Sequence, residues 1–518
     1  MRRHNAPMHD ESTLQSDAAP RWPGQLAAID MGSNSFRLEI GELADGRYRR
    51  IDYLKETVRL GAGLDADGLL TDEAAARGLA CLARFAKRLD GYRPEQVRAV
   101  ATQTLREARN RDQFLARAHQ ALGLPIEVIS GREEARLIYA GVARLQPSDE
   151  TRLVVDIGGR STEMILGRGP RPLRAESFQI GSVSLSMRYF ADGKFTTAAF
   201  RAAQVAAAAE LEEAFEPFGA RHWREALGSS GTVGAVAQLL DANKIGNGRI
   251  EPDGLRWLME RCLEAGRVDK LDLPGLKDDR RPVIGGGLAI LYTLASQFGI
   301  QSLIPARGAL RQGVIFDLDE RLRAAGAQPS GHDIREASVQ ELQRRFGVDV
   351  AQADRVARVA ARLFDEAFPT AGADARRELL WACALHEIGM MVSHHDHHRH
   401  SAYLLSHVDA AGFSQSQLRR IADLVLGQRG GLRKLEARLV ENEFAWQVLC
   451  LRLGAIHCHA RAATGDADIV LRRDGDKARL GFAPGWSEDH PSTLHLLHEE
   501  SDAWAKAGRL SLHLGPVG

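Results

Sequence analysis

Apolar residues along this chain follow two patterns, and each pattern predicts a different kind of element. Short apolar runs broken by Gly, Ser and Asp, such as 26–29 and 153–155, are typical of strands joined by tight turns. Longer segments with helical spacing alternate with these runs and predict helices over 71–89, 110–122, 132–145 and 198–215. Strands and helices that alternate along a chain indicate a mixed α/β architecture.

The pattern changes after residue 320. Residues 321–333 have the composition of a linker, residues 339–463 read as helical, and the last part alternates like strands again. We therefore predict a disordered tail at 1–23, a first α/β lobe at 24–137 and a second at 138–320. A helical domain at 334–465 and a small C-terminal α/β domain at 466–518 complete the prediction.

Two of the strand-turn-strand segments are built on the same plan. Aligned on their aspartates, they match at four positions: Asp30 with Asp156, Gly32 with Gly158, Ser35 with Ser161, and Gly41 with Gly167. Glycine lets a backbone approach a ligand closely, and successive N–H groups in such a turn form a concavity that binds anions. Two such loops that face each other, each with an aspartate, predict a cleft for phosphate and metal. Two ordinary β-turns are the alternative.

Two further glycine-rich segments allow two interpretations each. Residues 227–233, which include Ser230, Gly231 and Thr232, read as a strand, a small loop and a helix start, a common anion site. A plain helix cap explains them equally well. Residues 284–291 contain three successive glycines and also read as a strand, a loop and a helix. They indicate either close approach to a bulky ligand such as a nucleotide or tight packing between elements.

Several charged residues are candidates for chemistry, each with a plainer alternative. Ser130 caps the helix at 132–145, so Glu134 lies in its first turn, where acidic residues are favoured in any helix. Arg106 follows an apolar run and could grip a phosphate or be a surface charge. Six histidines between residues 386 and 400 are compatible with a metal site. Solvated loop residues are the interpretation we prefer for these histidines.

Composition excludes little but restricts the class of protein. The 68 basic and 68 acidic residues balance, so global charge favours no nucleic acid partner, and a polyanion would need a local basic patch. Five scattered cysteines fit a reducing compartment and predict a cytoplasmic protein. No apolar run approaches the length of a membrane span, and residues 1–23 lack the apolar core of a signal peptide.

Taken together, these motifs resemble one known family. The segments 30–37, 156–163, 130–139, 228–232 and 308–314 are similar to those of the exopolyphosphatase / guanosine pentaphosphate phosphohydrolase (Ppx/GppA) family, and the similarity continues through 385–389 and 398–404. The full-length chain resembles the long bacterial exopolyphosphatases. That resemblance implies two actin-like (ASKHA) lobes, an all-helical HD-like domain without its metal site, and a small C-terminal α/β domain. It also suggests a homodimer.

The resemblance further implies a reaction and a set of residues. The reaction is Mg²⁺-dependent hydrolysis of the terminal phosphoanhydride of inorganic polyphosphate, which releases orthophosphate. Glu134 matches the catalytic glutamate that orients or deprotonates the attacking water. Asp156 and Glu163 match the carboxylates near the metal, with Asp30 close by. The residues expected to bind phosphate, including neighbours in the same loops, are Ser33, Asn34, Ser35, Arg106, Gly158, Gly159, Arg160, Ser161, Ser230, Gly231 and Thr232.

Two departures from the family pattern leave alternatives open. Arg160 stands where the family has a third glycine, so it could block the loop or add a cation that faces the phosphates. Ala306 and Arg307 stand where the family has Ser and an acid. Hydrolysis of guanosine pentaphosphate in the same cleft is the nearest alternative function. A second alternative is a non-catalytic protein that binds polyphosphate or an alarmone, in which Arg160 has disabled turnover. A third alternative is an ATP-dependent kinase or chaperone of the actin-like superfamily.

Overall fold

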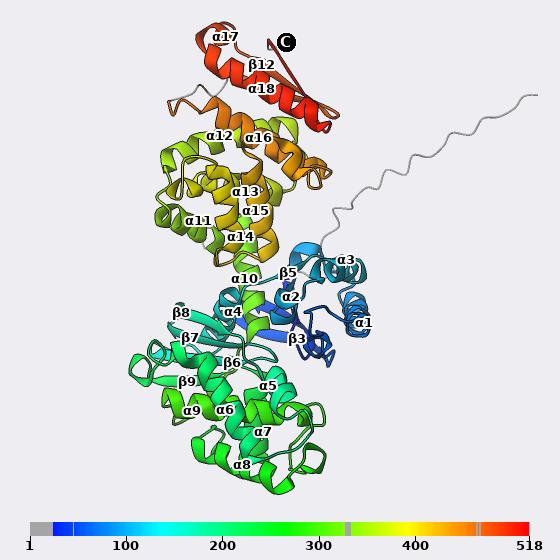
Figure 1. Cartoon of the computed structure of the whole chain (residues 1–518), viewed down its shortest axis with the longest axis vertical. Coiled ribbons are helices and arrows are strands. Elements are labelled where there is room, and N and C mark those ends of the chain that lie inside the picture. Colours follow the sequence, from blue (N-terminus) through cyan, green and yellow to red (C-terminus); the bar gives the residue numbers. More distant parts are fainter. Residues whose placement is uncertain (1–23, 45, 327–332, 463–464, 466–467, 517–518) are drawn as a thin grey trace, which may run out of the picture.

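The computed structural model describes residues 24–44, 46–326, 333–462, 465 and 468–516. The tail expected at 1–23 lies outside these residues. Two lobes that each contain a sheet, a helical domain and a small C-terminal sheet follow one another along the long axis of the molecule (Figure 1). The mixed α/β architecture with a helical C-terminal region is confirmed.

Lobe I is a five-stranded sheet with helices packed on it. Its strands lie in the order β3-β2-β1-β4-β5, antiparallel from β3 to β1 and parallel from β1 to β5. The strands are β1 Gln25–Met31, β2 Phe36–Ala44, β3 Arg47–Glu56, β4 Val97–Ala101 and β5 Ile126–Val128. The helices are α1 Asp72–Arg88, α2 Gln103–Glu107, α3 Arg111–Leu122 and α4 Gly131–Leu145.

Lobe II repeats this topology. Its sheet has the order β8-β7-β6-β9-β10, with the same antiparallel and parallel pairs. The strands are β6 Thr151–Ile157, β7 Thr162–Arg168, β8 Arg171–Phe178, β9 Glu225–Gly228 and β10 Leu303–Pro305. The helices are α5 Ser182–Tyr189, α6 Thr197–Leu211, α7 Gly231–Ala242, α8 Pro252–Ala265 and α9 Ile284–Phe298.

Gly41 and Gly167, one of the matched pairs, have the same structural role in their two lobes. The pairing of β2 with β3 shifts register after Ile40, and that of β7 with β8 shifts after Leu166, so Gly41 and Gly167 both sit at a bulge. A methyl group at Gly41 would lie 2.3 Å from the Tyr48 ring, and one at Gly167 would lie 2.0 Å from the Tyr139 ring. Each glycine therefore leaves room for a tyrosine against the sheet. The internal duplication read from the sequence is present in the fold.

Two helices join the lobes through a shared apolar core. Helix α10 Leu310–Ala325 packs against α4, and a methyl group at Gly313 would lie 1.8 Å from the carbonyl oxygen of Leu137. Buried residues of both sheets and both helices form one cluster, which includes Ala28, Val154 and Val314. The glycine thus permits a close crossing that fixes how the two lobes face each other.

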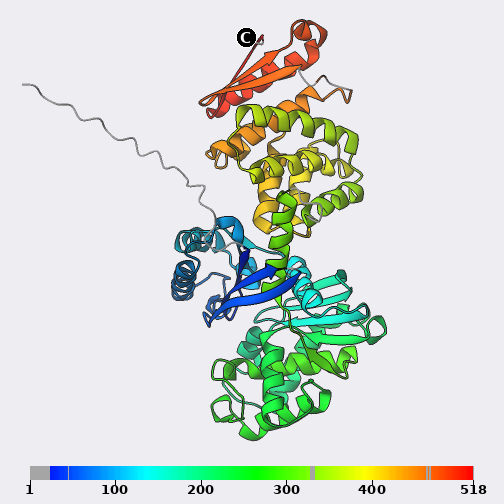
Figure 2. The same ribbon diagram turned by 180° about the vertical axis from the view of Figure 1, so that it is seen from behind.

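The helical domain and the C-terminal sheet share one hydrophobic core. Leu363, Trp446, Leu480 and Trp504 belong to the same cluster, and in Figure 2 the C-terminal sheet lies at the end remote from the lobes. The helices are α11 Ile334–Arg345, α12 Val350–Ala367, α13 Ala373–Leu385, α14 His397–His407, α15 Gln415–Gly427 and α16 Asn442–His457. The C-terminal elements are β11 Ile469–Asp474, β12 Lys477–Phe482, α17 Trp486–Asp489, α18 Pro491–Ala507 and β13 Ser511–Pro516.

The helical domain contacts lobe I next to the start of α4. Ser414 forms an isolated bridge with Ile129, the Gly412 amide donates to Glu133 Oε2 (2.8 Å), and Arg321 donates to the Gly412 carbonyl (2.6 Å). Gly412 has φ +85°, and a methyl group there would lie 2.5 Å from Ile334, so only glycine fits this contact. The helical domain is therefore tied to the turn that carries Glu134.

The structure corrects two expectations about elements. Residues 284–287 are the first turn of α9 rather than a strand and loop, and a methyl group at Gly286 would lie 2.5 Å from the Ser182 carbonyl oxygen. The three glycines thus serve helix packing. Helix α10 also continues to Ala325 through the start of the expected linker, and residues 327–332 lie outside the described part of the chain.

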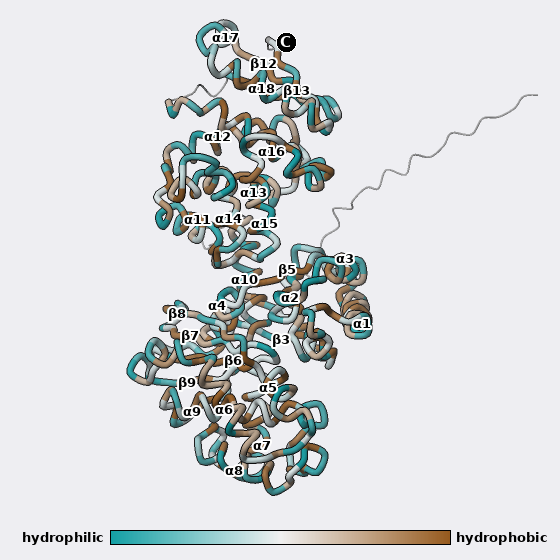
Figure 3. Tube along the Cα trace, in the orientation of Figure 1, coloured by the Kyte–Doolittle hydropathy of each residue, from teal (hydrophilic) through white to brown (hydrophobic). Residues whose placement is uncertain are grey.

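No helix in the described ranges is long and apolar enough to cross a membrane. The teal residues in Figure 3 lie mainly along the outer helices and loops.

Candidate active site

A cleft of about 480 Å³ lies between the two lobes. Both hairpin loops, the start of α7 and residues 306–312 line it. A wider hollow of about 1060 Å³ runs along α12, but its Arg362 and Arg376 already pair with Glu366 and Asp365. The cleft is therefore the place where the predicted residues converge. Those that line it are Asp30, Ser33, Asn34, Ser35, Glu134, Asp156, Gly158, Gly159, Ser161, Ser230, Gly231 and Thr232.

The two hairpin loops face each other closely. A methyl group at Gly159 would lie 3.1 Å from Ser33 Cβ, so these loops meet across the cleft. Methyl groups at Gly32 and Gly158 would lie 3.2 Å and 3.1 Å from the Ser35 and Ser161 carbonyl oxygens, and only small residues fit both turns. The Ser35 hydroxyl is buried without a hydrogen-bond partner among the described residues. It is thus available to a ligand oxygen.

The start of α7 adds an anion-binding terminus. The Ser230 hydroxyl caps the helix by accepting from the Val233 amide (3.1 Å), and the Thr232 hydroxyl donates to the Ile157 carbonyl (3.0 Å). Both hydroxyls are thus used within the protein. The first N–H groups of a helix have no partner inside it and carry its positive dipole end, so a phosphate oxygen fits here.

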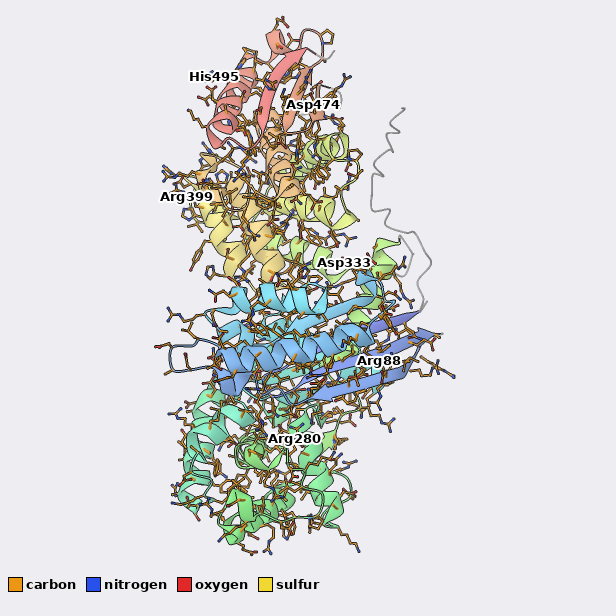
Figure 4. All side chains as sticks on the ribbon, turned by 90° about the vertical axis from the view of Figure 1, so that its right-hand side faces the viewer. Arg88, Arg280, Asp333, Arg399, Asp474 and His495 are labelled. Atoms are coloured by element: carbon orange, nitrogen blue, oxygen red, sulfur yellow. The ribbon has the colours of Figure 1, made fainter. Side chains whose placement is uncertain are left out.

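A wall of basic side chains also lines the cleft. Arg280 lies so close that a methyl group at Gly231 would be 2.5 Å from its Nη2 atom, and burial followed by the charge of Arg37 lowers its pKa. Figure 4 shows Arg280 where the sheet of lobe I meets lobe II. The basic residues of this wall are Arg37, Arg50, Lys55, Lys277, Arg280, Arg307 and Arg311.

Of the residues in this wall, sequence reasoning singled out only Arg307. Arg280 stands in the polar run 278–281, which shows no phosphate-loop pattern, so no local signal marks it. Arg37 could have been found, because the hairpin register sets it opposite Asp30, to which it donates at 3.1 Å. Arg311 also lies 3.6 Å from Asp30. Asp30 therefore already has two cationic partners.

Three other carboxylates cluster with unfavourable electrostatics. Burial raises the pKa of Asp156 to about 6, and burial together with the charges of Glu134 and Asp156 raises the pKa of Glu163 well above its usual range. Burial also raises the pKa of Glu134 to about 7, against the opposing effect of Arg106. Buried like charges of this kind are stabilised by an added cation. They also mark functional sites.

An arginine holds Glu134 in place. Ser130 caps α4 by accepting from the Glu133 amide (3.2 Å), as expected, and this places Glu134 in the first turn. Arg106 donates to Glu134 Oε2 (2.9 Å) and to the Ile129 carbonyl (3.0 Å). Arg106 does not line the cleft, although it was predicted to bind phosphate. Here it fixes the glutamate instead.

Arg160 does not line the cleft either. Its Nε donates to Glu107 Oε2 (2.9 Å) and its Nη1 donates to the Gly61 carbonyl (3.1 Å), both in lobe I. Arg160 is not among the described residues with positive φ, so the loop needs no left-handed conformation at this position. Neither alternative read from the sequence describes it, because the guanidinium bridges the lobes.

A magnesium ion fits the carboxylates that remain. Glu163 lies opposite Asp156 in the β6–β7 register, its Oε1 accepts from Ser177 (2.8 Å), and its buried Oε2 accepts no hydrogen bond from the described residues. Within the described ranges, no three acidic, His or Cys side chains converge as a protein-only metal site. Mg²⁺ usually keeps several waters and binds one or two carboxylates together with substrate phosphates. The donor set therefore suits Mg²⁺ better than a fully caged metal.

The histidine segment matches the solvated loop that we expected only in part. His394 and His395 are exposed and lie outside the helices, whereas His386, His397 and His398 are buried, the last two in α14. Beside His386, the Glu387 carboxylate accepts from Arg461 (2.6 Å). An arginine thus neutralises the acid that follows His386.

Comparisons with known proteins match most of this chain to one family. Residues 40–322 match the model of the Ppx/GppA phosphatase family, and residues 334–501 match the model of Ppx/GppA phosphatase domain III. Among solved structures, the Aquifex aeolicus PPX-GPPA enzyme is 27% identical with a TM-score of 0.48, covering 56% of this chain and 98% of its own. An exopolyphosphatase-like protein is 25% identical with a TM-score of 0.51, covering 58% and 98%. An exopolyphosphatase from Cytophaga hutchinsonii is 23% identical with a TM-score of 0.52, covering 60% and 100%.

Proposed function

This chain belongs to the Ppx/GppA phosphatase family, and from that premise we propose that it is an exopolyphosphatase. It hydrolyses the terminal phosphoanhydride of inorganic polyphosphate and releases orthophosphate. The observation that carries the proposal is the cleft itself, where phosphate-binding loops, a helix start and basic side chains surround Glu134. The similar exopolyphosphatase-like protein supports the same assignment.

The lining of the cleft favours polyphosphate over a guanine nucleotide. Tyr53 is the only aromatic residue among the described residues that line it. The guanidinium groups of Arg311 and Arg50 lie 5.2 Å and 5.6 Å from the centre of its ring. A nucleobase would have to compete with these cation–π contacts to stack there. A polyphosphate chain needs only cations along its path, and the wall supplies them.

Glu134 supplies the proton chemistry in this proposal. The water oxygen attacks the terminal phosphorus, the bridging P–O bond breaks, and its electron pair stays on the shortened chain. The Glu134 carboxylate accepts the proton of the water, while Arg106 holds that carboxylate in place. The loop N–H groups and basic side chains neutralise the phosphate charge, which is the main task in phosphoryl transfer.

Asp156 and Glu163 would hold Mg²⁺, with Asp30 nearby. The ion would supply charge neutralisation at the phosphate oxygens, which repel an incoming nucleophile. Asp156 lines the cleft, and Glu163 keeps a buried oxygen without a partner among the described residues. Asp30 is less free to bind, because Arg37 and Arg311 already contact it.

The first test is orthophosphate release from long-chain polyphosphate with Mg²⁺, beside guanosine pentaphosphate and ATP. We expect release from polyphosphate to be fastest. Release from guanosine pentaphosphate alone would identify the alarmone, not polyphosphate, as the substrate. Release from ATP alone would contradict both substrates. Binding of polyphosphate without any release would make the chain a binder. The assignment of an exopolyphosphatase would then be wrong.

The pH dependence of kcat/KM should follow Glu134. Its pKa is raised to about 7, so the base is protonated below that pH and active above it. We expect kcat/KM to fall about tenfold per unit below about pH 7 at low Mg²⁺. Higher Mg²⁺ should move this limb to lower pH, because a cation favours the ionised carboxylates. Initial rates from about pH 5 to about pH 9 measure it, and a flat profile would contradict Glu134 as the base.

A further inference from the structure

Arg160 connects lobe II to lobe I beside the cleft rather than inside it. It stands in the loop between β6 and β7, and its Nε and Nη2 atoms lie 2.9 Å and 2.7 Å from Glu107 Oε2. Its Nη1 donates to the Gly61 carbonyl. A methyl group at Gly61 would lie 2.9 Å from Arg160 Cδ, so the glycine makes room for the arginine. Both of its partners belong to lobe I.

The contact continues inside lobe I through one turn of α2. The second oxygen of Glu107, Oε1, accepts from Gln103 Nε2 at 2.6 Å. The amide oxygen of Gln103 in turn accepts from Arg106 Nε (2.9 Å) and Nη2 (2.6 Å). Because an amide can donate and accept at once, Gln103 links the Glu107 carboxylate to the Arg106 guanidinium.

The chain of hydrogen bonds ends at the proposed base. Arg106 uses its remaining Nη1 to hold Glu134 Oε2 (2.9 Å) and the Ile129 carbonyl. Its guanidinium is therefore fixed on one side by Gln103 and on the other by Glu134. Polar side chains now run without a break from the phosphate loop of lobe II to Glu134. Charge-assisted bonds in a partly buried network of this kind are strong and directional.

We propose that Arg160 is a positioning residue that couples the seating of the two lobes against each other to the orientation of Glu134. The inference rests on the proposed function, since it gives Glu134 its role. Without Arg160, Glu107 lacks its cation and no longer fixes the Gln103 amide that holds Arg106. The Arg106 guanidinium then loses its fixed position, and the Glu134 carboxylate loses its fixed direction toward the water.

A phosphate-binding role for Arg160 is the rival explanation. Its side chain is absent from the residues that line the cleft, and both of its ends are engaged by Glu107 and Gly61. A phosphate ligand would instead point into the cleft with free donors. The two roles predict opposite effects when Glu107 is neutralised.

The test compares Arg160→Ala, Arg160→Lys, Glu107→Gln and the double variant Arg160→Ala/Glu107→Gln. We expect Arg160→Ala and Glu107→Gln each to lower kcat about tenfold, with KM for polyphosphate changed less than about threefold. The double variant should be no slower than either single variant, because both break one chain. Arg160→Lys should recover part of kcat, since one ammonium keeps the Glu107 contact.

Controls separate this role from others. Arg168→Ala removes an exposed arginine of the same hairpin and should leave kcat unchanged. Within the described part of the chain, its side chain donates only to the Asp149 carbonyl. A raised KM in Arg160→Ala with a lowered KM in Glu107→Gln would overturn the proposal in favour of phosphate binding. Unchanged kcat in Arg160→Ala would also overturn it. A fall in kcat matched by a lower melting temperature, without recovery in Arg160→Lys, would reduce Arg160 to a structural residue.

Hydrogen exchange tests the coupling between Arg160 and Glu134 without relying on turnover. Hydrogen exchange of the segment that contains Ser130 and Glu134 should become faster in Arg160→Ala and Glu107→Gln, but not in Arg168→Ala. A wild-type protein that releases no phosphate would contradict the proposed function only. Unchanged exchange in both variants would contradict the coupling, whatever the substrate.

Discussion

Replacing Glu134 with alanine is expected to lower phosphate release from polyphosphate by about 10²- to 10⁴-fold, the usual contribution of a positioned base. Binding of polyphosphate should remain largely intact. In the proposed function, the basic wall and the loop N–H groups that line the cleft bind the substrate, whereas Glu134 acts on the water. The loss should therefore appear in kcat and not in the dissociation constant.

The measurement pairs steady-state phosphate release with direct polyphosphate binding. Glu134→Gln is the matched control for shape, because the amide oxygen can still accept from Arg106 but the side chain takes no proton. It should be as inactive as the alanine variant. Glu134→Gln should not unfold at lower temperature than wild type, since it keeps the Arg106 contact and removes a buried carboxylate with a raised pKa. Full activity in either variant would reject Glu134 as the base.

Replacing Asp317 with asparagine is expected to destabilise the junction of the lobes by about 3–5 kcal/mol, because it leaves buried charges without a partner. Asp317 lies in α10 and accepts from Arg98 (2.6 Å) and Arg136 (2.5 Å), and Arg321 lies 2.6 Å away. Burial alone would raise the pKa of Asp317, but the three guanidinium groups outweigh it and hold the pKa far below its usual range.

Hydrogen exchange of the amides in α4 and α10 measures this local stability. The matched control is Asp319→Asn, two residues along the same helix, whose ion pair with Arg323 is more exposed. Exposed i,i+4 pairs contribute about 0.3–0.5 kcal/mol, so this variant should exchange almost like wild type. Equal protection in the Asp317 and Asp319 variants would contradict the role given to the buried network.

The Asp317 network also bears on the active site. Arg136 donates to both Asp317 and Glu133, and Glu133 is the neighbour of Glu134 that accepts the Gly412 amide of the helical domain. We therefore expect Asp317→Asn to lower kcat as well as stability. The contact between the helical domain and Glu133, and the first turn of α4, should become less ordered together.

Local patterns in the sequence were sufficient for much of the fold. The hairpins, the Ser130 cap and helices such as Asp72–Arg88 were predicted within a few residues, because each depends on neighbours a few positions away. The duplication was readable for the same reason. The glycines at 285–287 left a ligand loop and tight packing open as alternatives, because three glycines fit both equally well, and only the structure showed the packed helix start.

Most of the cleft was likewise predictable, since its loops are continuous segments. Ser33 and Gly159 lie in turns that line the cleft, and the backbone conformation of such turns follows from the local residues. Arginines were less predictable. Arg106, Arg160 and Arg280 have long side chains whose partners are chosen by what the folded chain brings near, and no short pattern records that choice.

By itself, then, the amino-acid order determined the two matched turns, the helix that carries Glu134 and the residue types available for phosphate and metal. Only the tertiary structure decided that Arg106 serves Glu134, that Arg160 joins Glu107 across the lobes, and that Arg280 enters the cleft. The physical reason is the sequence separation over which each kind of interaction acts. Turns and caps are set by steric and hydrogen-bonding preferences over a few residues, whereas a buried charge is satisfied by any partner that packing places within about 3 Å.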